Sequence, residues 1–127
     1  MDGAGISSEG LKTVVIADDD IVVRHILSAI LESSYKVVTF ELGQGCLDYF
    51  EANTADVLFL DIQLPDYTGP EVLKILTSKL GDKKPFVIGV SANPEAEMRE
   101  LFSSSPPDAF LEKPFTPDGV MAVLAMS

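Results

Sequence analysis

The stretch VVIADDD, residues 14–20, decides the fold expected for this chain. Its first four residues are apolar and three of them are β-branched, and a continuous run of this kind is typical of a strand buried on both faces of a sheet. Similar short runs follow at residues 37–40, 57–60, 86–90 and 109–111. The sequence therefore predicts five short buried strands.

Segments with helical spacing of apolar residues lie between these runs, most clearly at residues 21–30 and 72–80. A second helix near residues 46–52 is short and its bounds stay open. Asp20, Asn93 and Thr116 are expected N-caps of the first, fourth and fifth helices, the last two with a proline next in the chain. Strand and helix thus alternate five times, which predicts a doubly wound α/β domain with a parallel sheet.

The length and charge of the chain limit what it can be. At 127 residues it has room for one ordinary domain, expected over residues 12–127 after a flexible tail over residues 1–11. A net charge of −11 argues against direct binding of nucleic acid or an anionic membrane surface. Neither a secretory signal nor an apolar membrane segment is recognisable, so we expect a cytoplasmic protein that does not insert into membranes.

Polar side chains gather where the predicted strands end. The first strand runs into three aspartates, Asp18 to Asp20, the third into Asp61, the fourth into Ser91, and the fifth into Glu112 and Lys113. In open parallel sheets, ligands bind at this edge. Because crowded carboxylates repel one another unless a cation neutralises them, we expect Mg²⁺ here, with Mn²⁺ able to replace it in vitro.

A carboxylate beside such a metal, with a hydroxyl and an amine nearby, is equipped to attack phosphorus and form an acyl phosphate. This is the chemistry that the residue types at the predicted sheet edge favour.

Four motifs, in this order and spacing, resemble the receiver family, the phosphoacceptor domains that include the bacterial chemotaxis response regulator. The motifs are VIADDD (15–20), LFLDIQLP (58–65) with Gly69 after it, VIGVSA (87–92) and FLEKPF (110–115). The resemblance covers about residues 12–125 and implies a flavodoxin-like fold with five parallel strands in the order 2-1-3-4-5. Pro65 and Gly69 match the loop after the acceptor strand, where glycine is expected to supply a turn that a larger side chain would strain.

The resemblance also implies the metal site. Asp61 resembles the phosphoacceptor and a metal ligand, Asp19 resembles the direct metal ligand, and Asp18 resembles the acid that holds the metal mainly through water. The backbone carbonyl of Gln63 would complete the protein's share of the coordination.

Further residues are implied around the phosphoryl group. Lys113 and the Ser91 hydroxyl would contact its oxygens, and the Lys113–Pro114 bond resembles the family's cis peptide. Phe110 matches the aromatic switch position, whose ring turns inward as Ser91 moves toward the phosphoryl group.

By the same resemblance, the chain would accept a phosphoryl group from the phosphohistidine of a sensor histidine kinase or a histidine phosphotransfer protein. It would catalyse its own phosphorylation and slow dephosphorylation without being a conventional metabolic enzyme. The fourth helix, fifth strand and fifth helix would form the face that binds an effector, and a phosphorylation-dependent homodimer is a further expected partner.

Three alternatives compete with this interpretation. An aspartyl phosphatase of the haloacid dehalogenase type carries a second acid two residues after its nucleophile, where this chain has Gln63. A flavodoxin needs a first loop that binds phosphate, and three aspartates would repel that anion. An inert pseudo-receiver would lack part of the site, whereas the full set of site residues is present here.

Overall fold

The structure is a computed structural model, and it describes residues 10–103 and 105–127. The tail expected over residues 1–11 lies outside the described residues except for its last two positions. The elements follow one another as β1 (Thr13–Ala17), α1 (Ile21–Leu31), β2 (Lys36–Phe40), α2 (Gly43–Ala52), β3 (Val57–Asp61), α3 (Gly69–Leu80), the 3₁₀ turn η2 (Gly81–Lys83), β4 (Phe86–Ser91), α4 (Glu95–Leu101), β5 (Ala109–Glu112) and α5 (Pro117–Leu124).

The five strands form one parallel sheet in the order β2-β1-β3-β4-β5, which confirms the predicted topology. β3, at the centre, is buried at every position, as its uninterrupted apolar sequence predicts. The direction in which successive strands are added to the sheet reverses between β1 and β3, because β2 lies outside β1 while the later strands continue from β3. In sheets of this kind the ligand site lies beyond the carboxyl ends of the strands at such a point.

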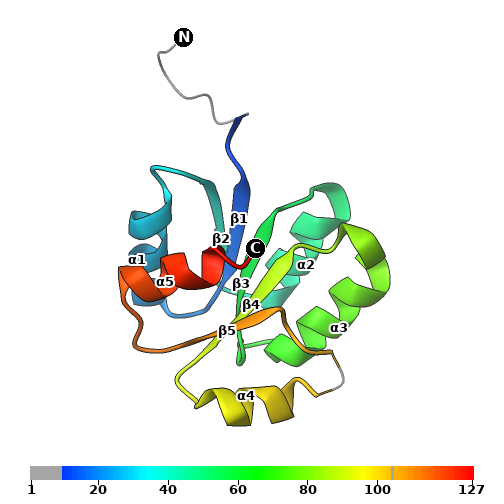
Figure 1. Cartoon of the computed structure of the whole chain (residues 1–127). Helices are drawn as coiled ribbons and strands as arrows, with labels where there is room; N and C mark the ends of the chain where they lie inside the picture. The colour runs from blue at the N-terminus through cyan, green and yellow to red at the C-terminus, as the bar shows by residue number, and fades with distance from the viewer. Residues whose placement is uncertain (1–9, 104) are drawn as a thin grey trace.

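Helices cover both faces of the sheet (Figure 1). Helices α1 and α5 pack on one face, where their buried residues meet alternate strand residues such as Ile16, Phe59 and Ile88. Helices α2 and α3 pack on the other face, against Leu58 and Leu60, and the residue after α4, Phe102, joins this second cluster. The strand side chains alternate between the two clusters, as the period of two in a strand requires.

The helix starts agree with the sequence at two of the three expected places. Asp20 caps α1 by accepting from the backbone N–H of Val22, and Thr116 caps α5 by accepting from that of Gly119. The expectation that Asn93 caps the fourth helix is wrong: Pro94 occupies the N-cap of α4, and the Asn93 side chain bonds elsewhere. Helix α2 also begins at Gly43, earlier than the sequence indicated.

The carboxyl ends of β1, β3, β4 and β5 bring the polar residues of the motifs to one edge of the sheet. The buried polar side chains of the described residues are Asp18, Asp61 and Ser91, and all three lie at these strand ends. Within residues 10–103 and 105–127, none of the helices has the length and apolar character that crossing a membrane demands.

Candidate functional site

The acidic loop after β1 is held by its own backbone. Asp18 is only 2% exposed, and its Oδ1 accepts a hydrogen bond from the backbone N–H of Asp20 at 2.9 Å. Asp19 lies between them and is exposed. The side chain of Asp20 is used for the cap of α1, so it is Asp18 and Asp19 that are available to the crevice.

Asp61, the last residue of β3, lies opposite this loop and is 6% exposed. Burial raises the pKa of its carboxyl to about 6, and the charge of Asp18 adds to this shift. The ammonium of Lys113 and the backbone N–H of Gln63 work in the opposite direction. The crevice thus holds the charged form of Asp61 at a cost in desolvation and, secondarily, in electrostatic repulsion.

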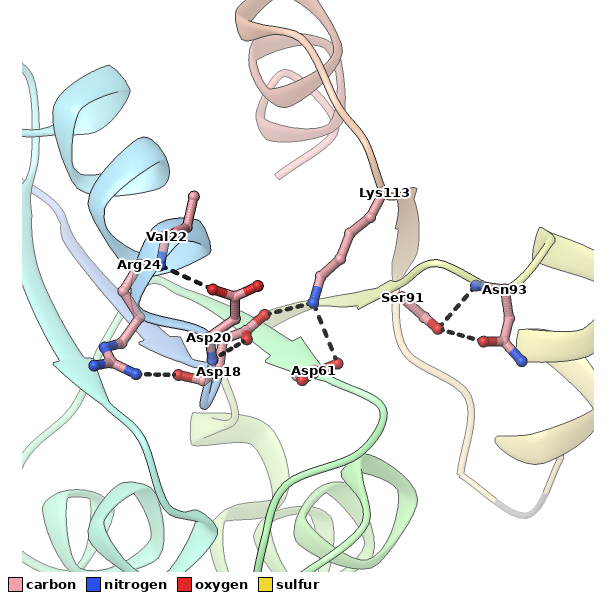
Figure 2. A network of polar contacts seen from close by, with 8 residues as sticks. All are labelled: Asp18, Asp20, Val22, Arg24, Asp61, Ser91, Asn93 and Lys113. Atoms are coloured by element: carbon pink, nitrogen blue, oxygen red, sulfur yellow. Dashed lines mark hydrogen bonds and ion pairs between the residues drawn. The ribbon is translucent and has the colours of Figure 1, made fainter.

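Lys113 lies between the two buried carboxylates (Figure 2). Its Nζ is 2.9 Å from Oδ2 of Asp18 and 3.7 Å from Oδ1 of Asp61. Burial alone would lower the pKa of Lys113, but its hydrogen bond to Asp18 and the nearby negative charges outweigh burial and raise that pKa. The backbone of Lys113 is also anchored, because its N–H donates to the carbonyl of Ser91 at 2.7 Å, and the Lys113–Pro114 bond is cis, as the resemblance implied.

The residues present match the donor set of a divalent metal. One carboxylate oxygen from each of Asp18, Asp19 and Asp61 lies within 4.8 Å of the others. Oxygen donors at this spacing suit Mg²⁺, which is usually held by one or two carboxylates together with phosphate and water. Two negative charges brought next to Asp61 also give the site a physical need for a cation, because a single lysine does not balance three carboxylates.

The loop after β3 is fixed around Gln63. Gln63 and Thr68 form an isolated antiparallel bridge, made by hydrogen bonds from Gly69 N–H to Ile62 and from Leu64 N–H to Tyr67. In such a pair the backbone N–H and C=O of Gln63 point away from Thr68. The N–H faces Asp61, where it lowers the pKa of that carboxyl.

Gly69 was expected to supply a turn, but the structure requires a glycine at this position for close packing. Among the described residues, the glycine with positive φ is Gly81, whereas Gly69 begins α3. A Cβ atom at Gly69 would lie 2.6 Å from the carbonyl oxygen of Asp61 and 3.0 Å from Cα of Ile62. Real Cβ atoms do not approach so closely, so glycine permits the start of α3 to pack directly on the end of β3.

The same loop is tied to α2 by a contact that the sequence did not predict. The carboxylate of Asp66 accepts hydrogen bonds from the N–H groups of Gly43 and Gln44 at 2.8 and 2.9 Å. It thereby satisfies the start of a helix whose own N-cap residue, Leu42, has no capping side chain. Burial raises the pKa of Asp66, but the backbone hydrogen bonds to its carboxylate together outweigh burial and lower that pKa. Tyr67 adds a hydrogen bond from its hydroxyl to Gln44 at 3.0 Å.

Ser91 ends β4 and is 3% exposed, but its hydroxyl does not contact Asp61 or Lys113 in Figure 2. It donates to Oδ1 of Asn93 at 3.0 Å and accepts from the backbone N–H of Asn93 at the same distance. Asn93 therefore uses its side chain on Ser91 instead of capping α4. The sequence offered no signal for this choice, because an asparagine before a proline is a good cap in its own right.

Phe110 lies on β5, half-buried, at the side of the crevice that faces α4. Its ring is 6.2 Å from the ring of Phe102, edge to face, and the guanidinium of Arg99 lies 5.1 Å above it. The ring therefore packs against the buried cluster on one side and is covered by Arg99 on the other.

Arg24 is a site residue that the sequence did not indicate. From α1 its Nη1 donates to the backbone carbonyl of Asp18 at 2.8 Å, and Figure 2 shows it on the far side of the acidic loop from Lys113. The loop that presents Asp18 and Asp19 is thus held from the helix side by a guanidinium. An arginine within a helix is ordinary in sequence, so only its position in the fold reveals the contact.

A family model described as the response regulator receiver domain matches residues 14–125. Among curated relatives, the cell cycle response regulators CtrA of Brucella ovis and Brucella abortus are 28% identical over 112 residues, covering 88% of this chain and 47% of each CtrA. The chain therefore spans about half the length of the curated relatives it matches.

Solved structures give the same picture of the fold. The chemotaxis response regulator CheY4 of Vibrio cholerae superposes with a TM-score of 0.84 at 24% identity, covering 91% of this chain and 98% of that one. The receiver domain of the sensor histidine kinase PA1611 from Pseudomonas aeruginosa, solved with a magnesium ion coordinated in its active site cleft, has a TM-score of 0.83 at 20% identity and covers 92% and 97%. With the match over residues 14–125, these observations show that the chain belongs to the response regulator receiver domain family.

Proposed function

We propose that this chain accepts a phosphoryl group on Asp61, in a Mg²⁺-dependent reaction, from the phosphohistidine of a sensor histidine kinase or histidine phosphotransfer protein. Membership of the receiver family supports a two-component phosphoacceptor role. The observation that supports the assignment to Asp61 is its position: a buried carboxylate at the end of the central strand, beside two further acids and 3.7 Å from an ammonium.

In this proposal one oxygen of Asp61 bonds to phosphorus as the bond between phosphorus and the partner's histidine nitrogen breaks. The imidazole nitrogen keeps the electron pair of that bond and takes up a proton. Lys113, already between Asp18 and Asp61, is placed to pair with a phosphoryl oxygen once Asp61 no longer attracts it as strongly. Mg²⁺ held by Asp18, Asp19, Asp61 and the Gln63 carbonyl would supply charge neutralisation for the transferring group.

The surface beside Lys113 supports delivery by a protein partner. A groove of about 300 Å³ runs from Asp20 to Phe115 and is largely apolar, with Ile26 of α1 on its rim. Ile21 and Val22, which lie in the chain between Asp20 and Val23 of its lining, are 55% and 59% exposed. A protein that brings phosphohistidine to Asp61 would cover this groove, and we place the exchange in the cytoplasm, where a kinase has ATP.

The output side of the proposal is the face formed by α4, β5 and α5. Ser91 would turn toward the phosphoryl group and Phe110 would turn inward, which changes the surface where Arg99 covers the ring. Met126, just after α5, lines a hollow with Arg99 and Phe110 and is 62% exposed, so this face has apolar area available for an effector or for a second copy of the chain after phosphorylation.

Slow self-dephosphorylation would return the chain to its resting state. Gln63 is exposed beside Asp61, and its amide is too weak an acid to protonate a leaving group, which argues against general phosphatase activity. The presence of all three acids together with Lys113 argues against an inert pseudo-receiver.

The test is incubation of the protein with Mg²⁺ and a small acyl phosphate or phosphoramidate, followed by mass spectrometry of the intact protein. We expect one added phosphoryl group in the native chain, none with EDTA, and none in Asp61→Asn. Asp82→Asn, which alters an exposed aspartate in η2, is the matched control and should label fully. Equal labelling of Asp61→Asn and the native chain would contradict the assignment.

A further inference from the structure

The hydroxyl of Ser91 makes two hydrogen bonds, both with Asn93. It donates to Oδ1 of Asn93 and accepts from the Asn93 N–H, both at 3.0 Å, and the side chain is 3% exposed. In Figure 2 these two contacts run from Ser91 toward the β4–α4 loop, while Lys113 and Asp61 form a separate group. The resting position of the hydroxyl is therefore set by Asn93.

A serine hydroxyl has two lone pairs but one proton. The bond from the Asn93 N–H uses a lone pair and leaves the proton of the hydroxyl uncommitted. The bond to Oδ1 of Asn93 uses the proton, which a phosphoryl oxygen on Asp61 would also need. Phosphorylation and the Asn93 side chain thus compete for the same donor.

The position of Asn93 connects this competition to α4. It immediately precedes Pro94 and α4, a helix of seven residues without a side-chain cap. Any loss of the Ser91 contact frees the residue that leads into α4, and α4 carries Arg99 above the ring of Phe110.

We propose that Asn93 is a positioning residue that holds the Ser91 hydroxyl away from Asp61 until a phosphoryl oxygen takes its proton. The inference rests on the proposed phosphoacceptor function of Asp61. It adds that the resting state is stabilised by a specific side chain, whose removal makes the phosphorylated arrangement easier to reach. One neutral hydrogen bond corresponds to about three- to tenfold in an equilibrium constant.

The rotamer of Ser91 gives a test that needs neither metal nor phosphoryl group. Three-bond couplings about the Ser91 Cα–Cβ bond, measured by NMR, should report a single rotamer in the native chain. Asn93→Ala should average these couplings, whereas Asn93→Asp, which keeps an acceptor oxygen at the same place, should preserve the single rotamer. Unchanged couplings in Asn93→Ala would overturn the proposal.

The second measurement is the affinity for BeF₃⁻, a phosphoryl mimic, at saturating Mg²⁺, by calorimetry on the full chain. We expect Asn93→Ala to bind about three- to tenfold more tightly than the native chain. Asn53→Ala, which alters the other asparagine of the chain, should bind like the native chain. In a Ser91→Ala background, Asn93→Ala should have no further effect, since the hydroxyl that it releases is absent.

The outcomes separate the two proposals. If the native chain binds no BeF₃⁻ at Asp61, the proposed function fails, whatever the rotamer of Ser91. If the native chain binds it and Asn93→Ala binds no more tightly, or the gain persists without the Ser91 hydroxyl, the role of Asn93 is wrong. Thermal melts of each variant show whether it is folded at the temperature of the measurement.

Discussion

Helices α3 and α4 follow neighbouring strands that both end in the crevice, yet the chain holds them very differently. α3 has twelve residues, a complete capping box between Thr68 and Glu71, and four buried residues. α4 has seven residues, no side-chain cap, and Met98 as its buried residue. The loop before α3 is bonded to α2 through Asp66, whereas the loop before α4 is closed by the Ser91–Asn93 pair.

Under the proposed function, this difference separates two tasks of one crevice. Metal ligands and the acceptor need fixed positions, because misplaced charges in a site of this kind are costly. A segment that reports phosphorylation needs an alternative arrangement within a few kcal/mol of the resting one, and weakly stabilised elements provide this. The β3–α3 side suits the first task and the β4–α4 side suits the second.

The largest expected change in stability comes from a substitution at Gly69, on the β3–α3 side of the crevice. Gly69→Ala places a Cβ against the backbone of Asp61 and Ile62, which cannot move away as a flexible side chain would. We expect a loss of about 3 kcal/mol in the free energy of unfolding, at the upper end for overpacking, measured by urea titration. Gly119→Ala, in α5, is the control: its Cβ would lie 3.4 Å from the Thr116 side chain and 3.9 Å from that of Leu111, so the change should be neutral or slightly stabilising. If Gly69→Ala left the free energy of unfolding unchanged, the β3–α3 loop would be less rigid than its contacts indicate.

Hydrogen exchange measures the local stability of α3 and α4 directly. Amides in the middle of α4 should open with a free energy about 2 kcal/mol below those of α3, equivalent to about thirtyfold faster exchange after correction for intrinsic rates. The reason is the smaller buried surface and the missing cap of α4. Equal protection of the two helices would mean that α4 is as stable as α3.

Asp61→Asn should stabilise the metal-free protein, in a way that depends on pH. The pKa of Asp61 is about 6 in the folded chain and near 3.8 in the unfolded chain. A raised pKa favours the folded state below the unfolded value, and that stability is lost as the pH rises through about 6. After discounting for water at the open crevice, we expect Asp61→Asn to be about 1–2 kcal/mol more stable than the native chain at pH 7.5.

Urea titrations in EDTA at pH 7.5 and pH 4 measure this effect. The advantage of Asp61→Asn should shrink strongly at pH 4, where the native carboxyl is protonated. Added Mg²⁺ should raise the stability of the native chain more than that of the variant, since a ligand stabilises the state that binds it. An advantage that is the same at both pH values would rule out charge repulsion as its cause.

The smallest expected change in stability comes from removing the contact between the β3–α3 loop and α2. Asp66→Ala removes the carboxylate that accepts from Gly43 and Gln44, and loss of a helix cap costs about 1 kcal/mol. Urea titration should show this loss, and Asp66→Asn should recover part of it because it keeps one acceptor oxygen. Asp82→Ala, at an exposed aspartate, is the control for removing a negative charge. A cost no larger than that of Asp82→Ala would mean that α2 does not steady the loop.

Much of the fold was predictable because its signals are local. Runs such as VLFLD indicate buried strands by composition alone, and Asp20 and Thr116 cap their helices through atoms two or three residues away. The ends of α2 were not predictable, since its start is satisfied by Asp66, 23 residues further along the chain.

The sequence by itself determined which chemical groups reach the crevice: in a parallel sheet, whatever follows each strand lies at the same edge, so Asp18, Asp61, Ser91 and Lys113 had to gather there. The tertiary structure alone decided how those groups are held. Arg24 on the carbonyl of Asp18, Asn93 on Ser91 and Gly69 against Asp61 depend on side-chain directions and distances between separate elements. Periodicity and spacing describe one segment at a time, so they contain no record of these contacts.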